Sequence, residues 1–126
     1  MALETKAGSV LDRIIEARRT AVSHRKRLIP EPVLRMAVSK AESARDFAAA
    51  LSRDGVNIIA ELKKASPSRG VLRKDFDPKL LAPQLEQAGA VALSVLPEEE
   101  FFKGSLKDLR LARAAVAVPL LRKDFM

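Results

Sequence analysis

The spacing of hydrophobic residues divides this chain into two parts. Up to about residue 54, apolar side chains recur every three or four positions with charged residues between them, the pattern of amphipathic helices. Pro30 and Pro32 interrupt this pattern, and Asp54-Gly55 is a signal that ends a helix. We therefore expect helices over residues 5–27, 31–39 and 43–53.

After residue 55, short apolar runs alternate with helical patterns, which predicts strands over residues 56–62, 90–96 and 118–123. Pro78, with Asp77 as its N-cap, opens a helix that ends at Gly89, and Ser105 caps another that reaches Val116. Alternating strands and helices predict a parallel sheet, and right-handed crossovers place both helices on one face. Because the strands are almost entirely apolar, we expect both faces to be covered. The predicted fold class is α/β, the opening of a barrel or of a doubly wound sheet.

Composition narrows the class of protein. The chain has 126 residues, 48% of them hydrophobic, which is enough for one packed domain. It has no cysteine, which excludes disulfides and thiolate chemistry and suits a cytoplasmic location. One histidine, His24, is too few for a His-rich metal site. No apolar run approaches the roughly 20 residues of a membrane helix, and the first residues lack the pattern of a signal peptide.

The net charge of +7 suggests an anionic partner, either nucleic acid or a phosphate ester. The densest basic cluster is residues 24–27, close to Arg18 and Arg19. Nucleic-acid grooves usually combine basic side chains with aromatic ones, and this cluster has no aromatic residue. We interpret it as a solvated basic helix face, with nucleic-acid binding as the alternative.

Three charged residues lie at or near the carboxyl ends of the predicted strands: Glu61, Lys63 and Lys123. In a parallel α/β fold these ends meet at one rim. Two ammonium groups and a carboxylate at such a rim can bind an anion and transfer protons. Because Glu-x-Lys pairs are common in surface charge patterns, a solvent-exposed salt bridge is the alternative interpretation.

The loops after the strands hold further candidates. Ser66, Ser68 and Gly70 offer hydroxyls and a close backbone approach, although the segment matches neither common phosphate-binding motif. Phe101 and Phe102 either line an aromatic pocket or pack in the core. The sequence of residues 72–76 recurs at residues 121–125, in a different predicted context, and five residues are too few to indicate a structural repeat.

Five motifs, in order and spacing, resemble the amino-terminal half of the indole-3-glycerol-phosphate synthase family. They are IIAELKKASPSRG at residues 58–70, DFDP at 75–78, GAVALSVL at 89–96, FFKGS at 101–105 and LLRKDF at 120–125. The resemblance covers about residues 5–126. It implies a (β/α)8 TIM barrel of tryptophan biosynthesis that needs no metal or organic cofactor. The family closes the indole ring of 1-(2-carboxyphenylamino)-1-deoxyribulose 5-phosphate, releasing carbon dioxide and water.

The resemblance also implies roles for individual residues. Lys123 matches the general acid that protonates the ribulose carbonyl oxygen, and Lys63 a lysine that contacts the substrate and assists acid chemistry. Glu61 matches the glutamate that orients this lysine and takes part in proton transfer. The implied substrate-binding residues are Ser66 in the loop over the site, and Phe102 and Phe125 beside the anthranilate ring. Pro97 departs from the family, which commonly has a small polar residue there.

We expect a helical extension over residues 1–54, packed beside the barrel and helping to bind substrate, and the first strands of the barrel over residues 55–126. Such barrels have roughly 250 residues, so we expect this chain to be truncated and inactive alone. The expected partner is a phosphorylated small molecule, not nucleic acid or a membrane. The alternative is a non-catalytic half-barrel that self-associates through open strand edges, or complements a carboxyl-terminal fragment.

Overall fold

The structure, a computed structural model, describes residues 8–126 and consists of two compact units. The first comprises the described residues up to Ser43 together with Phe125–Met126, and the second comprises Ala44–Asp124. The expected start of the first helix at Thr5 lies outside the described residues. The domain boundary at residue 54 stays a prediction.

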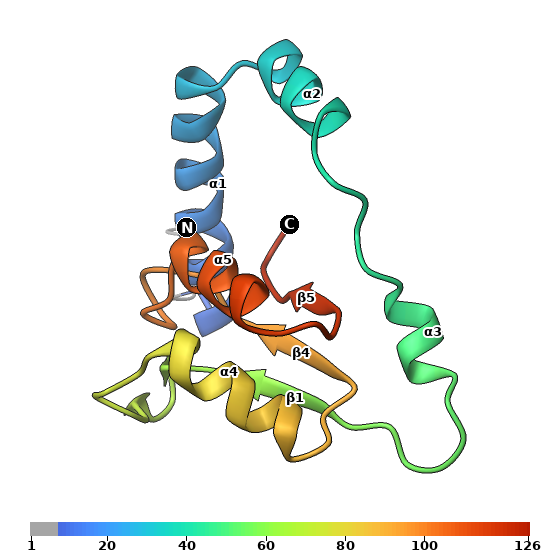
Figure 1. Ribbon diagram of the computed structural model, residues 1–126. Helices are drawn as coiled ribbons and strands as arrows, with labels where there is room; N and C mark the ends of the chain where they lie inside the picture. The colour runs from blue at the N-terminus through green and yellow to red at the C-terminus, as the bar shows by residue number, and fades with distance from the viewer. Residues whose placement is uncertain (1–7) are drawn as a thin grey trace, which may run out of the picture. The chain divides into compact units, whose positions relative to one another are not determined.

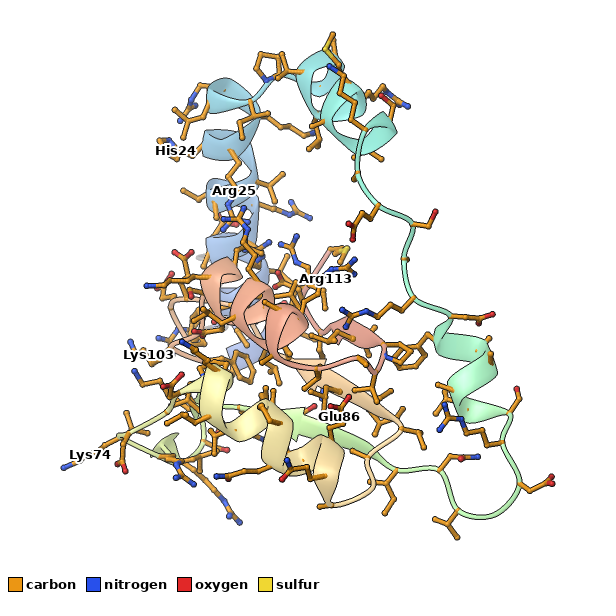
Figure 2. The ribbon with its side chains drawn as sticks, viewed as in Figure 1. His24, Arg25, Lys74, Glu86, Lys103 and Arg113 are labelled. Atoms are coloured by element: carbon orange, nitrogen blue, oxygen red, sulfur yellow. The ribbon has the colours of Figure 1, made fainter. Side chains whose placement is uncertain are left out.

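The first unit contains two helices, α1 (Val10–Leu28) and α2 (Glu31–Ser39). The α1 helix begins at Val10 because Ser9 and Asp12 form a capping box. The Ser9 hydroxyl accepts the Asp12 N–H at 3.2 Å, and the Asp12 carboxylate accepts the Ser9 N–H at 2.8 Å. The α2 bounds confirm the prediction. His24, labelled on α1 in Figure 2, is exposed, as a solvated basic face requires.

The second unit contains a three-stranded parallel sheet in the order β1-β4-β5 (Figure 1). Its elements are α3 (Phe47–Leu51), β1 (Ile59–Leu62), β2 (Ala65–Ser66), β3 (Gly70–Val71), α4 (Pro78–Gln87), β4 (Ala92–Val95), α5 (Leu106–Ala115) and β5 (Leu120–Arg122). The two crossover helices, α4 and α5, pack against each other and against the same face of the sheet. This confirms the predicted parallel sheet with both helices on one side.

The alternation of side chains along the strands separates a core face from an open face. Leu62, Leu93 and Val95 point to the helices and are at most 3% exposed. The opposite face, which we expected to be covered as well, is covered only in part. Ile59 and Leu121 on that face are 41% and 44% exposed.

Helix α3 and the three strands of the parallel sheet are shorter than predicted. A side-chain cap sets the start of the helix and strand pairing sets the ends of the strands, whereas the prediction followed the apolar residues. Helix α3 starts at Phe47 since the Asp46 carboxylate accepts the Ala49 N–H at 2.9 Å. The loop after β1 contains an antiparallel hairpin, β2-β3, where we predicted only a polar loop. It is closed by the N–H of Leu72, which donates to the carbonyl of Lys64 at 2.8 Å.

The turn between α5 and β5 is held by two charged side chains. The guanidinium of Arg45 donates to the carbonyls of Arg113, Val116 and Val118 at 3.1, 2.8 and 3.0 Å. One carboxylate oxygen of Glu86 accepts the N–H groups of residues 117 and 118 at 2.8 and 3.1 Å. Figure 2 labels Arg113 on α5 and Glu86 near the end of α4. These contacts fix the start of β5, and therefore the position of the residues that follow it.

Candidate active site

The carboxyl ends of β1 and β5 bring charged residues to one edge of the sheet. Glu61 pairs with Ser94 in the register of β1 and β4, and Ser94 pairs with Leu121 in that of β4 and β5. Lys123 lies two residues beyond Leu121, and its N–H donates to the carbonyl of Val95 at 2.9 Å, which continues the pairing. Because side chains alternate, Glu61, Ser94 and Lys123 share the open face.

The Glu61 carboxylate is the centre of this cluster. Its Oε2 accepts hydrogen bonds from Nζ of Lys123 at 2.9 Å and from Oγ of Ser94 at 3.2 Å. Its Oε1 lies 3.9 Å from Nζ of Lys63. The side chains of Glu61, Lys63 and Lys123 are 30%, 37% and 55% exposed. One carboxylate between two ammonium groups leaves a net charge of +1 that a dissolved anion can reach.

The three residues expected to be catalytic therefore do meet, as we expected from their places at the ends of parallel strands. Among the expected substrate-binding residues, Ser66 lies in the β2-β3 hairpin after β1, where its Oγ accepts the Arg69 N–H at 3.2 Å. Phe102 lies half-buried in the loop after β4. Both loops follow the carboxyl ends of parallel strands, the edge that carries Glu61.

Phe125 belongs to the first unit. Its carbonyl accepts a hydrogen bond from Nε of Arg18 at 3.3 Å. Together with Met126 and one side of α1 it lines a cavity of about 580 Å³. The α1 residues that line it are Ile15, Arg18, Arg19, Val22 and Ser23. The lining of this cavity thus includes one aromatic residue and two arginines.

Two polar residues that organise this edge were not predicted from the sequence. Ser94 is 4% exposed and bonds to Glu61, and its signal was a single hydroxyl in an otherwise apolar strand. Glu98 is 3% exposed and holds the loop that carries Phe102. It is the first of three consecutive glutamates, and no sequence pattern distinguishes it from the other two.

Residues 8–126 contain no cluster of three or more side chains suited to holding a metal ion. Within the same range, no helix is both long and apolar enough to cross a membrane. The cluster at the strand ends offers carboxylate, ammonium and hydroxyl groups, which are suited to acid–base chemistry and anion binding.

This fold and site define a parallel α/β segment of the barrel type, with a cluster of charged side chains at the carboxyl ends of its strands. Residues 11–126 match the sequence model of the family described as indole-3-glycerol phosphate synthase. The chain therefore belongs to the indole-3-glycerol phosphate synthase family. The family fold is the TIM barrel, and the sheet β1-β4-β5 with its helices is an incomplete part of one.

Curated relatives carry the same name. The chain is 46% identical over 118 residues to indole-3-glycerol phosphate synthase 1 of Streptomyces coelicolor, covering 94% of this chain and 44% of the relative. It is 45% identical over 120 residues to the synthase of Mycobacteroides abscessus, covering 95% and 44%. For the synthase of Desulfosudis oleivorans the values are 41% over 121 residues, covering 93% and 46%. The chain thus spans under half the length of these relatives.

Proposed function

We propose that this chain supplies the amino-terminal part of an indole-3-glycerol phosphate synthase active site. The reaction is the ring closure of 1-(2-carboxyphenylamino)-1-deoxyribulose 5-phosphate with loss of carbon dioxide and water. One observation carries the proposal: the carboxylate of Glu61 lies between Lys63 and Lys123 at the carboxyl edge of a parallel sheet. Family membership supports it.

The geometry suggests how these groups divide the chemistry. Lys123 donates a proton to the ribulose carbonyl oxygen while the ring carbon that bears the carboxylate attacks the carbonyl carbon. Carbon dioxide then leaves, and its bonding electrons restore the aromatic ring. Lys63 binds the substrate and, as a second acid, protonates the hydroxyl that leaves as water when its carbon–oxygen bond breaks. Glu61 orients the lysines and accepts the proton that the neighbouring methylene carbon loses as the new carbon–carbon double bond forms.

The remaining expected residues bind substrate in this proposal. Ser66 offers a hydroxyl from the loop after β1, and Phe102 and Phe125 flank the anthranilate ring. We propose that residues 1–126 alone do not turn over this substrate, because the lysines and the open face of the sheet are solvated. A site that does not exclude water cannot hold its charges in the low-dielectric surroundings that strengthen electrostatic catalysis.

The test is a fusion of this chain to the part of the S. coelicolor relative that the match leaves uncovered. Formation of indole-3-glycerol phosphate is followed by indole fluorescence. We expect Lys123→Met to lower kcat at least about 100-fold, since general acids contribute that much, with smaller losses for Lys63→Met and Glu61→Gln. Lys107→Met, an exposed lysine on α5, is the matched control. A folded fusion without turnover, or a Lys123→Met variant within threefold of its parent, would contradict the proposal.

A second candidate function follows from the strand edges. β1 and β5 are the two edges of the parallel sheet, and Ile59 in β1 and Leu121 in β5 are exposed. We propose that the chain, when alone, associates through these edges with a second copy or with a carboxyl-terminal segment of the family. Light scattering after size exclusion tests the first form. A monomer at every concentration, together with no gain of activity on mixing with the relative's carboxyl-terminal part, would contradict this candidate.

A further inference from the structure

The loop between β4 and α5, residues 96–105, is organised around one buried carboxylate. Glu98 Oε1 accepts the N–H of Glu100 at 2.9 Å, and Oε2 accepts those of Phe101 and Phe102 at 2.7 and 2.9 Å. The Glu98 residue is 3% exposed. A buried carboxylate that accepts three backbone N–H groups is bound by charge-assisted hydrogen bonds, the strong kind.

A backbone hydrogen bond near the carboxyl end of the same loop also restrains its shape. The carbonyl of Glu98 accepts the N–H of Gly104 at 2.8 Å. A Cβ at Gly104 would lie 2.1 Å from the carbonyl oxygen of Leu96, so only glycine fits. Lys103, labelled in Figure 2, takes φ of 54°, the left-handed region that non-glycine residues rarely adopt. The loop is therefore fixed in one shape, with Glu98 at its centre.

This shape sets the direction of the neighbouring aromatic rings. The two N–H groups that share Oε2 of Glu98 belong to Phe101 and Phe102, so the carboxylate fixes the backbone from which both rings project. A glutamine at the position would present an amide NH2 in place of one oxygen and face N–H groups with a donor. A neutral acceptor would also lose the charge that strengthens these bonds.

We propose that Glu98 is a positioning residue, whose carboxylate holds Phe102 at the place where it meets the aromatic ring of the substrate. The inference rests on the proposed function, because it needs Phe102 to contact the substrate. Glu98 acts through Phe102, so its removal weakens substrate binding more than it slows the chemical step. The expected signature is a raised KM with kcat nearly retained.

The fusion protein described above provides the test, in a cycle of Glu98→Gln, Phe102→Ala and the double variant. We expect each single change to raise KM roughly tenfold, and Glu98→Gln to add less than threefold in the Phe102→Ala background. Glu98→Asp keeps the charge and should recover part of the loss, and Glu100→Gln, an exposed neighbour, should change neither constant.

The outcomes distinguish the proposed contact of Phe102 with the substrate from the proposed positioning of Phe102 by Glu98. If Phe102→Ala leaves KM unchanged, the proposed role of Phe102 fails, and the inference fails with it. If Phe102→Ala raises KM while Glu98→Gln does not, or the two effects multiply, the positioning role alone is overturned. Amide hydrogen exchange of Phe101 and Phe102 in the 126-residue chain gives a readout without activity. Protection in the parent must be lost in Glu98→Gln, and equal protection in both would overturn the inference.

Discussion

Replacement of Arg45 by alanine tests a group of three polar contacts within the second unit. The Arg45 guanidinium joins the segment before α3 to the turn between α5 and β5, through the carbonyls of Arg113, Val116 and Val118. Alanine removes all three hydrogen bonds. The substitution leaves three part-buried carbonyl groups without these donors, and water has to replace the arginine as their hydrogen-bond donor.

The size of the loss follows from these contacts. A hydrogen bond that involves a charged group contributes about 1.5–3 kcal/mol, and three bonds to one half-exposed side chain do not add fully. We expect Arg45→Ala to lower the free energy of unfolding by about 2–3 kcal/mol. For a domain of this size that corresponds to a melting temperature lower by roughly 10–20 °C. Arg45→Lys keeps the charge but cannot reach three carbonyls, so it should lose about half as much.

The assay is urea unfolding of the 126-residue chain, followed by circular dichroism. Arg110→Ala is the matched control, because Arg110 is exposed on α5 and its loss should change stability by less than about 0.5 kcal/mol. If Arg45→Ala lies within about 0.5 kcal/mol of its parent, water replaces the arginine at no cost, and the reasoning is wrong.

Three further predictions concern the core, the site and the first helix. Leu93→Ala should lower the free energy of unfolding by about 3–5 kcal/mol, because Leu93 is fully buried, and a loss below about 1 kcal/mol in urea unfolding would show that this core does not form. Glu61→Gln should lower it by less than about 1 kcal/mol in the same assay, because both of its ion pairs are partly exposed, and a larger loss would mean that they are structural. Hydrogen bonds from Ser9 hold the pKa of Asp12 below its ordinary value, so NMR titration should find the lower pKa. The ionised Asp12 carboxylate stabilises α1 above the pKa that Asp12 has in the unfolded chain, and this contribution is lost as pH falls through the pKa that it has in the folded chain. The helicity of α1 should therefore fall below about pH 4, but not in Asp12→Asn.

Local signals in the sequence predicted the parts of the fold that local chemistry determines. The Asp77–Pro78 start of α4 and the Ser105 cap of α5 were confirmed because caps act within a few residues. The β2-β3 hairpin was missed, because strands of two residues are too short to show alternation. The strands were predicted too long because apolar residues continue beyond the paired segment, and only the partner strand determines where pairing stops.

The difference between local signals and strand pairing also explains which contacts of the site could be predicted. The meeting of Glu61, Lys63 and Lys123 was predictable, since each follows or ends a strand and parallel strands end together. The bond from Ser94 to Glu61 was not, because it depends on the register between β1 and β4. The selection of Glu98 among three glutamates depends on how the loop closes at Gly104, which no short pattern encodes.

Register also connects the amino-terminal side of the sheet to the charged cluster at its carboxyl edge. β5 has three residues, so few backbone bonds of its own hold it in place. Arg45 and Glu86 bind the turn immediately before it, so we expect them to favour the register in which Leu121 pairs with Ser94. A slip of one residue would turn Lys123 to the helix-covered face and present Arg122 or Asp124 to Glu61 instead. The two charged side chains at the start of β5 therefore hold Lys123 within hydrogen-bonding distance of Glu61, although neither reaches the site.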